Sequence, residues 1–199
     1  MSMWQCACVG VALAAAGASG AIYQMEAAGT IETIDHAFSG PYNTIITPGA
    51  SWTMTVQYDS SAPITSTVLP GFVNYETAIL SYELSVDGQM VIQNTAGKIG
   101  VSDGVLGDAY LFDGHRPDDE LSSILSVSDL SGSAFTGVAL PQQLDLTDFP
   151  DSEITIFTSS GDIGAHGSVS SLTLTVVPAP WSAAVLGGVG FLARRRRSA

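Results

Sequence analysis

Strict alternation of apolar and polar side chains is the feature that most limits what this chain can fold into. Residues 52–58 read Trp-Thr-Met-Thr-Val-Gln-Tyr, residues 80–86 read Leu-Ser-Tyr-Glu-Leu-Ser-Val, and residues 172–176 read Leu-Thr-Leu-Thr-Val. Successive side chains of a β-strand point to opposite faces of the sheet, so these segments are predicted to be strands with one buried face. No convincing amphipathic helix is found between residues 22 and 176.

Shorter apolar segments separated by turn signals extend this pattern. Asp87-Gly88 lies between two alternating runs and predicts a hairpin with a type I′ turn. Residues 62–73 hold two prolines and no alternation, which predicts a long loop. Together these features favour an all-β fold, an antiparallel β-sandwich or jelly roll. The further predicted strands are residues 29–34, 89–93, 99–102, 109–112, 124–127 and 154–158.

The C-terminal segment has a different composition from the rest of the chain. Residues 181–193 are uncharged, and an arginine cluster follows: Arg194, Arg195, Arg196 and Arg197. A helix of this length would be about 20 Å long, shorter than the roughly 30 Å hydrocarbon core of a bilayer. We expect a short transmembrane helix, with the arginines on the cytoplasmic side by the positive-inside rule. The alternative is a buried core helix followed by a basic tail, which would need polar positions at helical spacing.

The motif Val177, Pro178, Ala179 and Pro180, followed by a short apolar helix and terminal arginines, resembles the PEP-CTERM sorting signal in its VPAP variant. In that family the signal lies at the C-terminus of exported bacterial proteins. It is cleaved near the Pro-x-Pro motif by a membrane-embedded exosortase. The resemblance implies an exosortase-type membrane protease as a partner, and transient anchoring in the inner membrane. Ala179 stands where glutamate is usual, so the acidic contact of the main form is missing.

Residues 1–21 have the layout of a secretory signal peptide. The apolar run 9–18 is followed by small residues ending at Ala21, although no Lys or Arg precedes it. Both cysteines, Cys6 and Cys8, lie in this segment, so the mature chain would carry no disulfide and no cysteine metal ligand. The predicted domains are a signal peptide at 1–21, an acidic ectodomain at 22–176 and a sorting and anchor segment at 177–199.

The ectodomain is strongly acidic. All 19 Asp and Glu residues lie between Glu26 and Asp162, whereas Lys98 and Arg116 are its only basic residues, so its formal charge is −17. Such a surface repels nucleic acid, and nucleic-acid binding is therefore excluded. It attracts divalent cations or basic partners, but solubility outside the cell is a sufficient explanation.

The histidines and serines form no recognisable catalytic motif. His36, His115 and His166 have no metal-ligand spacing, and no Gly-x-Ser-x-Gly segment occurs. His115 lies in the densest polar stretch, residues 113–120, which is either a general-base or ligand site or an exposed loop; the loop is the simpler interpretation. We predict no catalytic residue and no cofactor.

Acidic residues at about five-residue intervals are the one pattern that points to a metal. Asp103, Asp108, Asp113 and residues 118–120 could supply oxygen ligands to a structural calcium ion. Their spacing matches neither an EF-hand nor a calcium-binding repeat, so ordinary Asp-Gly turns are expected and no metal site is predicted. Trp52 and Tyr82 lie on the apolar faces of alternating strands and are expected in the core rather than at a sugar site.

These expectations describe an exported cell-surface or extracellular-matrix protein with a structural or adhesive, non-enzymatic ectodomain. Extracellular polysaccharide is a candidate partner. One alternative is a carbohydrate- or calcium-binding β-sandwich, which would need a concave surface lined with aromatic or carboxylate side chains. The second is a secreted hydrolase, which would need a histidine within hydrogen-bond reach of a serine or carboxylate in a cleft.

Overall fold

Antiparallel strands form almost all of the regular structure. The computed structural model describes residues 20–95, 97–104, 107–115 and 121–178. The predicted all-β class is confirmed, and one short α-helix, α1 (Tyr42–Ile45), and one 3-10 turn, η1 (Leu146–Asp148), complete the structure. The strands are β1 (Ile22–Ile34), β2 (Ser51–Asp59), β3 (Ser66–Leu69), β4 (Phe72–Tyr75), β5 (Ile79–Val86), β6 (Gln89–Asn94), β7 (Gly97–Ser102), β8 (Asp108–His115), β9 (Ser122–Asp129), β10 (Glu153–Phe157) and β11 (Ile163–Val177).

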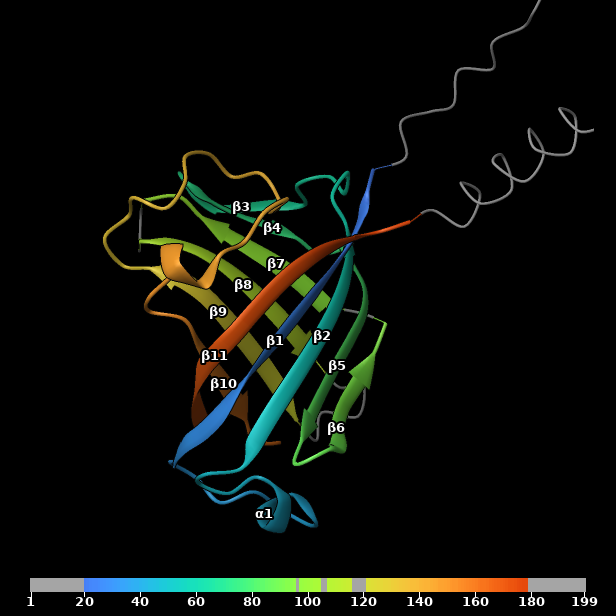
Figure 1. Cartoon of the computed structure of the whole chain (residues 1–199), viewed down its shortest axis with the longest axis vertical. Coiled ribbons are helices and arrows are strands. Elements are labelled where there is room, and N and C mark those ends of the chain that lie inside the picture. The colour runs from blue at the N-terminus through green and yellow to red at the C-terminus, as the bar shows by residue number, and fades with distance from the viewer. Residues whose placement is uncertain (1–19, 96, 105–106, 116–120, 179–199) are drawn as a thin grey trace, which may run out of the picture.

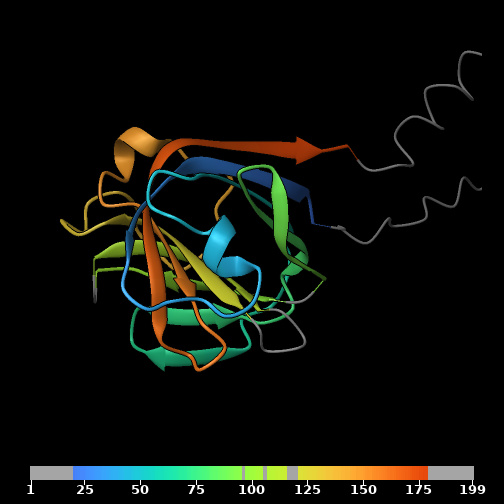
Figure 2. The ribbon, with the colours of Figure 1, turned by 90° about the horizontal axis from the view of Figure 1, so that it is seen from below.

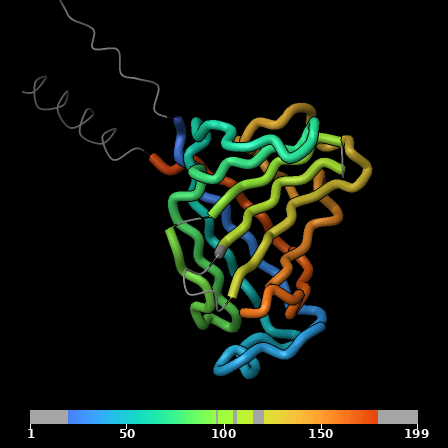
Figure 3. Tube along the Cα trace, turned by 180° about the vertical axis from the view of Figure 1, so that it is seen from behind, coloured from blue at the N-terminus to red at the C-terminus, as the bar shows by residue number. Residues whose placement is uncertain are grey.

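All eleven strands belong to one sheet, in the order β3-β4-β7-β8-β9-β10-β11-β1-β2-β5-β6. This sheet curls so that its two halves face each other. Figure 1 shows β11, β1 and β2 crossing in front of β7, β8 and β9, and Figure 3 shows the same layers from behind. The first residues of β11 pair with β10 while nearly its whole length pairs with β1, so β11 joins the two layers. Figure 2 shows α1 lying across one end.

The core lies between the two layers and is made by the alternating residues. Trp52, Met54, Val56 and Tyr58 of β2 are all buried, as the alternation predicts. In the paired strand β1, Met25 is opposite Val56 and points to the same side. Full burial of a Met or Val side chain stabilises a fold by roughly 1.5–3 kcal/mol, so this shared face accounts for the layer packing.

The Asp87-Gly88 hairpin is confirmed. Asp87 has φ 48° and Gly88 has φ 74°, the positive values that a type I′ turn requires. The Asp87 carboxylate also accepts hydrogen bonds from the backbone N–H of Ser51 (2.8 Å) and from its hydroxyl (3.0 Å). The turn is thereby tied to the start of β2.

The predicted long loop at residues 62–73 is wrong. This segment contains β3 and the start of β4, which pair around a turn at Pro70-Gly71. Both prolines lie outside the strands, where their missing N–H costs no ladder bond. Each strand has only four residues, too few for alternation to be visible in the sequence.

Several sequence predictions concern residues outside the described part of the chain. They are most of the signal peptide, Ala179 and Pro180 of the sorting motif, the expected helix at 181–193, the arginines at 194–197, and residues 116–120. Within the described ranges, no helix is both long enough and apolar enough to cross a bilayer.

Candidate functional site

A groove lies on the outer face of β3, β4, β7, β8, β9 and β10. It consists of three adjoining cavities of about 540, 230 and 440 Å³. The first and second share Lys98, Asp113 and Ile124, and the second and third share Phe72 and Leu111. Because these residues lie in successive rows of the same strands, the cavities form one groove along the strand direction. We call it the outer groove.

One row of outward-facing residues, from β7, β8 and β9, makes the floor of the outer groove. Gly100 of β7 is opposite Leu111 of β8, which is in turn opposite Ser126 of β9. A Cβ atom on Gly100 would lie 3.1 Å from the Phe72 ring, which is tighter than an ordinary contact. Glycine at this position therefore lets the ring lean over the floor.

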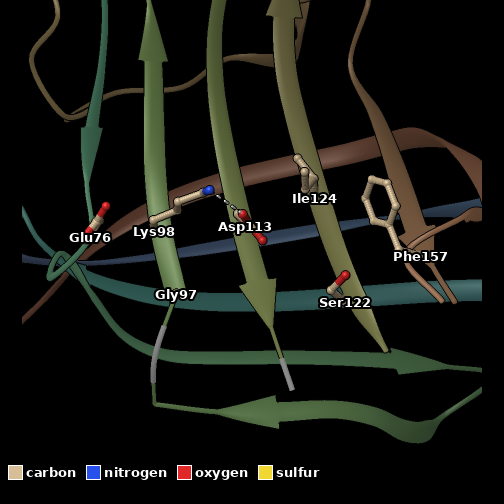
Figure 4. Close-up of a pocket in the computed structure, with 8 residues that line it drawn as sticks. Glu76, Gly97, Lys98, Asp113, Ser122, Ile124 and Phe157 are labelled. Carbon is tan, nitrogen blue, oxygen red and sulfur yellow. Dashed lines mark ion pairs between the residues drawn. The ribbon is translucent and has the colours of Figure 1, made fainter. Parts of the chain in front are cut away.

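One ion pair occupies the junction of the first two cavities. Lys98 Nζ lies 3.3 Å from Asp113 Oδ2, and their side chains are 49% and 22% exposed. Figure 4 shows both on the same side of the sheet as Ile124 and Phe157, with Glu76 on the other flank. Lys98 is the only Lys or Arg among the described residues. Since exposed ion pairs contribute only about 0–1 kcal/mol, both charges can exchange partners when a ligand binds.

Apolar side chains form the rest of the lining. Phe157 and Ile124 line the first cavity, while Phe72, Val68 and Leu111 line the second. Ser122 and Ser126 contribute hydroxyl groups at the floor. The groove thus combines apolar ring faces with carboxylates, an ammonium group and hydroxyls, which suits a ligand with many hydroxyl groups and apolar ring surfaces.

The aspartates considered as calcium ligands bond to backbone amides instead. Fully buried Asp108 accepts hydrogen bonds from the N–H groups of Gly104 (3.0 Å) and Phe135 (2.9 Å). Asp103 accepts one from Gly137 N–H (2.6 Å). Asp113 instead pairs with Lys98. Across the described ranges, no group of three or more His, Cys, Asp or Glu residues is placed to hold a metal ion.

Asp129 is bonded in the same way. Its carboxylate accepts hydrogen bonds from the hydroxyl and N–H of Ser131 and from the hydroxyl and N–H of Ser133, at 2.8–3.1 Å. The Ser131 hydroxyl and the Ser133 and Ser131 amides lower the pKa of Asp129 from 3.8 to about 2. Hydrogen bonds to the charged form stabilise it, so this carboxylate stays ionised.

These carboxylates attach one long loop, residues 130–152, to the sheet. Two tyrosine hydroxyls hold it as well: Tyr58 donates to the Pro141 carbonyl and Tyr75 to that of Val138 (2.6 Å). Burial raises the pKa of Tyr58, which keeps its hydroxyl protonated as a donor. Phe135 and Phe149 of the loop pack against Tyr110 of β8, with ring centroids 4.6 and 6.0 Å away. We call residues 130–152 the pinned loop.

Neither His36 nor His166 lines the outer groove. His36 Nδ1 lies 2.8 Å from the Ile163 carbonyl. His166 Nε2 lies 3.4 Å from Asp35 Oδ2, and its Nδ1 lies 3.3 Å from Thr155 Oγ1. His166 Nδ1 also lies 3.8 Å from Oε2 of Glu153, a carboxylate of the outer groove. The hydrolase alternative therefore gains a histidine beside a groove carboxylate, although His166 itself lines none of the described cavities. The side chain of His115 is outside the described part.

Apart from Asp113, the sequence did not indicate the groove residues. Lys98 was conspicuous only as a rare cation, and Phe72, Ile124 and Phe157 had no motif around them. The groove depends on side chains from six strands, and the sequence of one strand does not show which other strands lie beside it. Of the predicted sorting motif, Val177 ends β11 and Pro178 follows it.

Compared with known proteins, this chain matches no protein family, no curated protein and no solved structure.

Proposed function

We propose that this is an exported bacterial protein, sorted through residues 177–199 to the cell surface or extracellular matrix, with a structural or adhesive β-sandwich ectodomain. One observation supports this proposal best. The sheet begins at Ile22, directly after the candidate signal-peptide cleavage site, and ends at Val177, at the first residue of the Val-Pro-Ala-Pro motif. The folded region therefore occupies the interval between the two candidate processing sites.

The pairing of the two ends adds a geometric argument. Ile22 is opposite Val177 in the β1–β11 ladder, so both chain ends leave the domain at one corner. An anchor attached after Val177 would hold the domain by that corner, away from the outer face of β7, β8 and β9, which Figure 3 views from behind. A surface protein that contacts a matrix needs such a free face.

The test is the intact mass of the full chain expressed in a bacterium that has exosortase, with membrane and released fractions analysed separately. We expect released protein that begins near Ile22 and ends near Pro180. A variant with Pro178→Ala and Pro180→Ala should keep its C-terminus and stay in the membrane. Recovery of full-length protein in the cytosol, or equal release of the variant, would overturn the proposal.

A second candidate function is carbohydrate binding in the outer groove. Four carboxylates, from Glu76, Asp113, Asp151 and Glu153, line the groove against the single ammonium of Lys98. This charge disfavours anionic polysaccharides, so the groove fits an uncharged glycan best. The half-buried rings of Phe72 and Phe157 offer flat apolar surfaces for sugar rings, and the polar side chains between them can bond to hydroxyls.

A glycan array that groups oligosaccharides by charge tests this function. We expect binding to uncharged oligosaccharides and weakening of about tenfold on Phe157→Ala, equivalent to 1.4 kcal/mol. Leu80→Ala is the matched control, because Leu80 is a partly exposed apolar residue on β5, outside the groove. Binding only to anionic oligosaccharides, no binding at all, or equal effects of the two substitutions would eliminate glycan binding in the groove.

A further inference from the structure

The second half of β11 has a partner on only one side. Residues Ile163–Ser168 pair with β10, whereas from Val169 to Val177 the strand pairs with β1 alone. No turn or loop backbone group in the described part of the chain bonds to this segment. In Figure 2 it forms the outermost strand, with β1 beside it. The strand thus presents a row of unpaired backbone groups, which is a template for another strand.

This edge lacks the usual protection against pairing. Ser171–Val177 contains no charged residue and no proline, and it lies beyond the bulge near Ser170. The strands at the two ends of the sheet differ: β3 has only four residues and is flanked by Pro63 and Pro70, and the β5–β6 ladder is interrupted by a bulge. Natural proteins protect sheet edges with such devices. Pro178 follows the segment directly, but the seven residues from Ser171 to Val177 hold no charge, no proline and no bulge, so this stretch is long enough to pair with another strand.

The sequence of this edge is complementary to itself. Leu172, Leu174 and Val176 are opposite the core-facing residues of β1, so they share the core side of the sheet. Ser171, Thr173 and Thr175 point to the other side. An antiparallel copy centred on Leu174 would place Leu172 opposite Val176, Thr173 opposite Thr175 and Leu174 opposite itself. From Leu172 to Val176, apolar residues would meet apolar residues and hydroxyls would meet hydroxyls, while at the two ends Ser171 would lie opposite Val177.

We propose that two copies of this protein associate through Ser171–Val177, so that the sheet continues from one copy into the other. Leu172 and Leu174 are only half-buried in the single copy, and Val176 is 58% exposed. A two-fold related strand covers all three with the same residues of its partner, as a C2 interface requires. The segment is also an uncharged strip on a domain of formal charge −17, so like-charge repulsion is lowest there and added salt strengthens association.

Disulfide trapping tests the register. The full chain, in mild detergent and with Cys6 and Cys8 replaced by serine, would carry Leu174→Cys. Directly opposite residues of antiparallel strands have Cα atoms about 4.5–5.5 Å apart, within the range of a disulfide. We expect a covalent dimer under oxidation. The matched control is Met90→Cys, at a β6 position that is 50% exposed, and this variant should remain mainly monomeric. Equal trapping of the Leu174→Cys and Met90→Cys variants would overturn the proposal.

Sedimentation equilibrium of the same full-length protein tests the association itself. Val176→Lys places an ammonium group opposite Leu172 of the partner subunit and should weaken dimerisation at least about tenfold. Met90→Lys adds the same charge elsewhere and should leave the dissociation constant unchanged. A wild-type protein that is monomeric at its highest soluble concentration overturns the proposal, and so do equal effects of the two lysine substitutions.

Discussion

Asp108 and Asp129 beside the pinned loop and Asp113 in the outer groove have opposite roles, although all three are aspartates on β8 and β9. Asp108 at the start of β8 and Asp129 at the end of β9 accept hydrogen bonds from backbone amides of the pinned loop. Asp113, five residues after Asp108, faces the groove and pairs with Lys98. Asp108 and Asp129 stabilise the fold, whereas Asp113 is available to a ligand. A carboxylate's role therefore depends on which donors the tertiary structure places around it.

The largest expected effect is at Asp108. Asp108→Ala would leave two amides, of Gly104 and Phe135, without their acceptor. We expect a loss of about 3 kcal/mol in the free energy of unfolding, measured by urea denaturation. Glu32→Ala removes the same charge from an exposed position and should change stability by less than about 0.5 kcal/mol. Equal losses would show that Asp108 does not hold the pinned loop.

Acid should release the pinned loop at Asp129. The pKa of its carboxyl is about 2 in the folded protein against an ordinary value of 3.8, so the unfolded chain binds the proton more readily. Its contribution to stability is therefore present above about pH 4 and is lost as the pH falls toward 2. Urea titrations at several pH values should show this loss in the wild type and a smaller one in Asp129→Asn. The same pH dependence in both proteins would contradict this role.

A smaller effect is expected at the tyrosine that holds the middle of the pinned loop. Tyr58→Phe removes the donor to the Pro141 carbonyl and should cost about 1 kcal/mol. Tyr23 stacks on the Tyr58 ring at 5.7 Å, and Tyr23→Phe is the matched control, with an expected change below about 0.5 kcal/mol. Thermal unfolding of Tyr58→Phe and Tyr23→Phe measures the stability that each variant loses. A larger loss for Tyr23→Phe would assign the stability to ring packing instead.

The smallest effect on stability is expected in the outer groove. Lys98→Ala removes the partner of Asp113, but both side chains are partly exposed, so the loss should be below about 1 kcal/mol. Urea denaturation of Lys98→Ala and Asp108→Ala in parallel compares their losses in the free energy of unfolding. For glycan binding in the groove, we expect Lys98→Ala to lose more free energy of binding than free energy of unfolding. If Lys98→Ala destabilised the fold as much as Asp108→Ala, the contrast between the two regions would fail.

The strands themselves were largely predictable because their information is local. Alternation within residues 52–58 and 80–86 predicted β2 and β5, and Asp87-Gly88 predicted the turn after β5. The start of β1 was missed because Ala27, Ala28 and Gly29 blur its pattern, although Tyr23 and Met25 are buried. β3 and β4 were missed because four residues are too few to show a period.

By itself, the sequence determined the all-β class, the burial of Trp52 and Tyr82, and the acidic charge of the domain, because each depends on composition or on neighbours within one strand. Only the tertiary structure decided the strand order, the roles of the aspartates and the groove. Asp108 meets Phe135 across 27 residues, and Lys98 meets Asp113 because β7 pairs with β8. These contacts depend on which strands pair, and pairing is chosen by packing over the whole sheet rather than by any local segment.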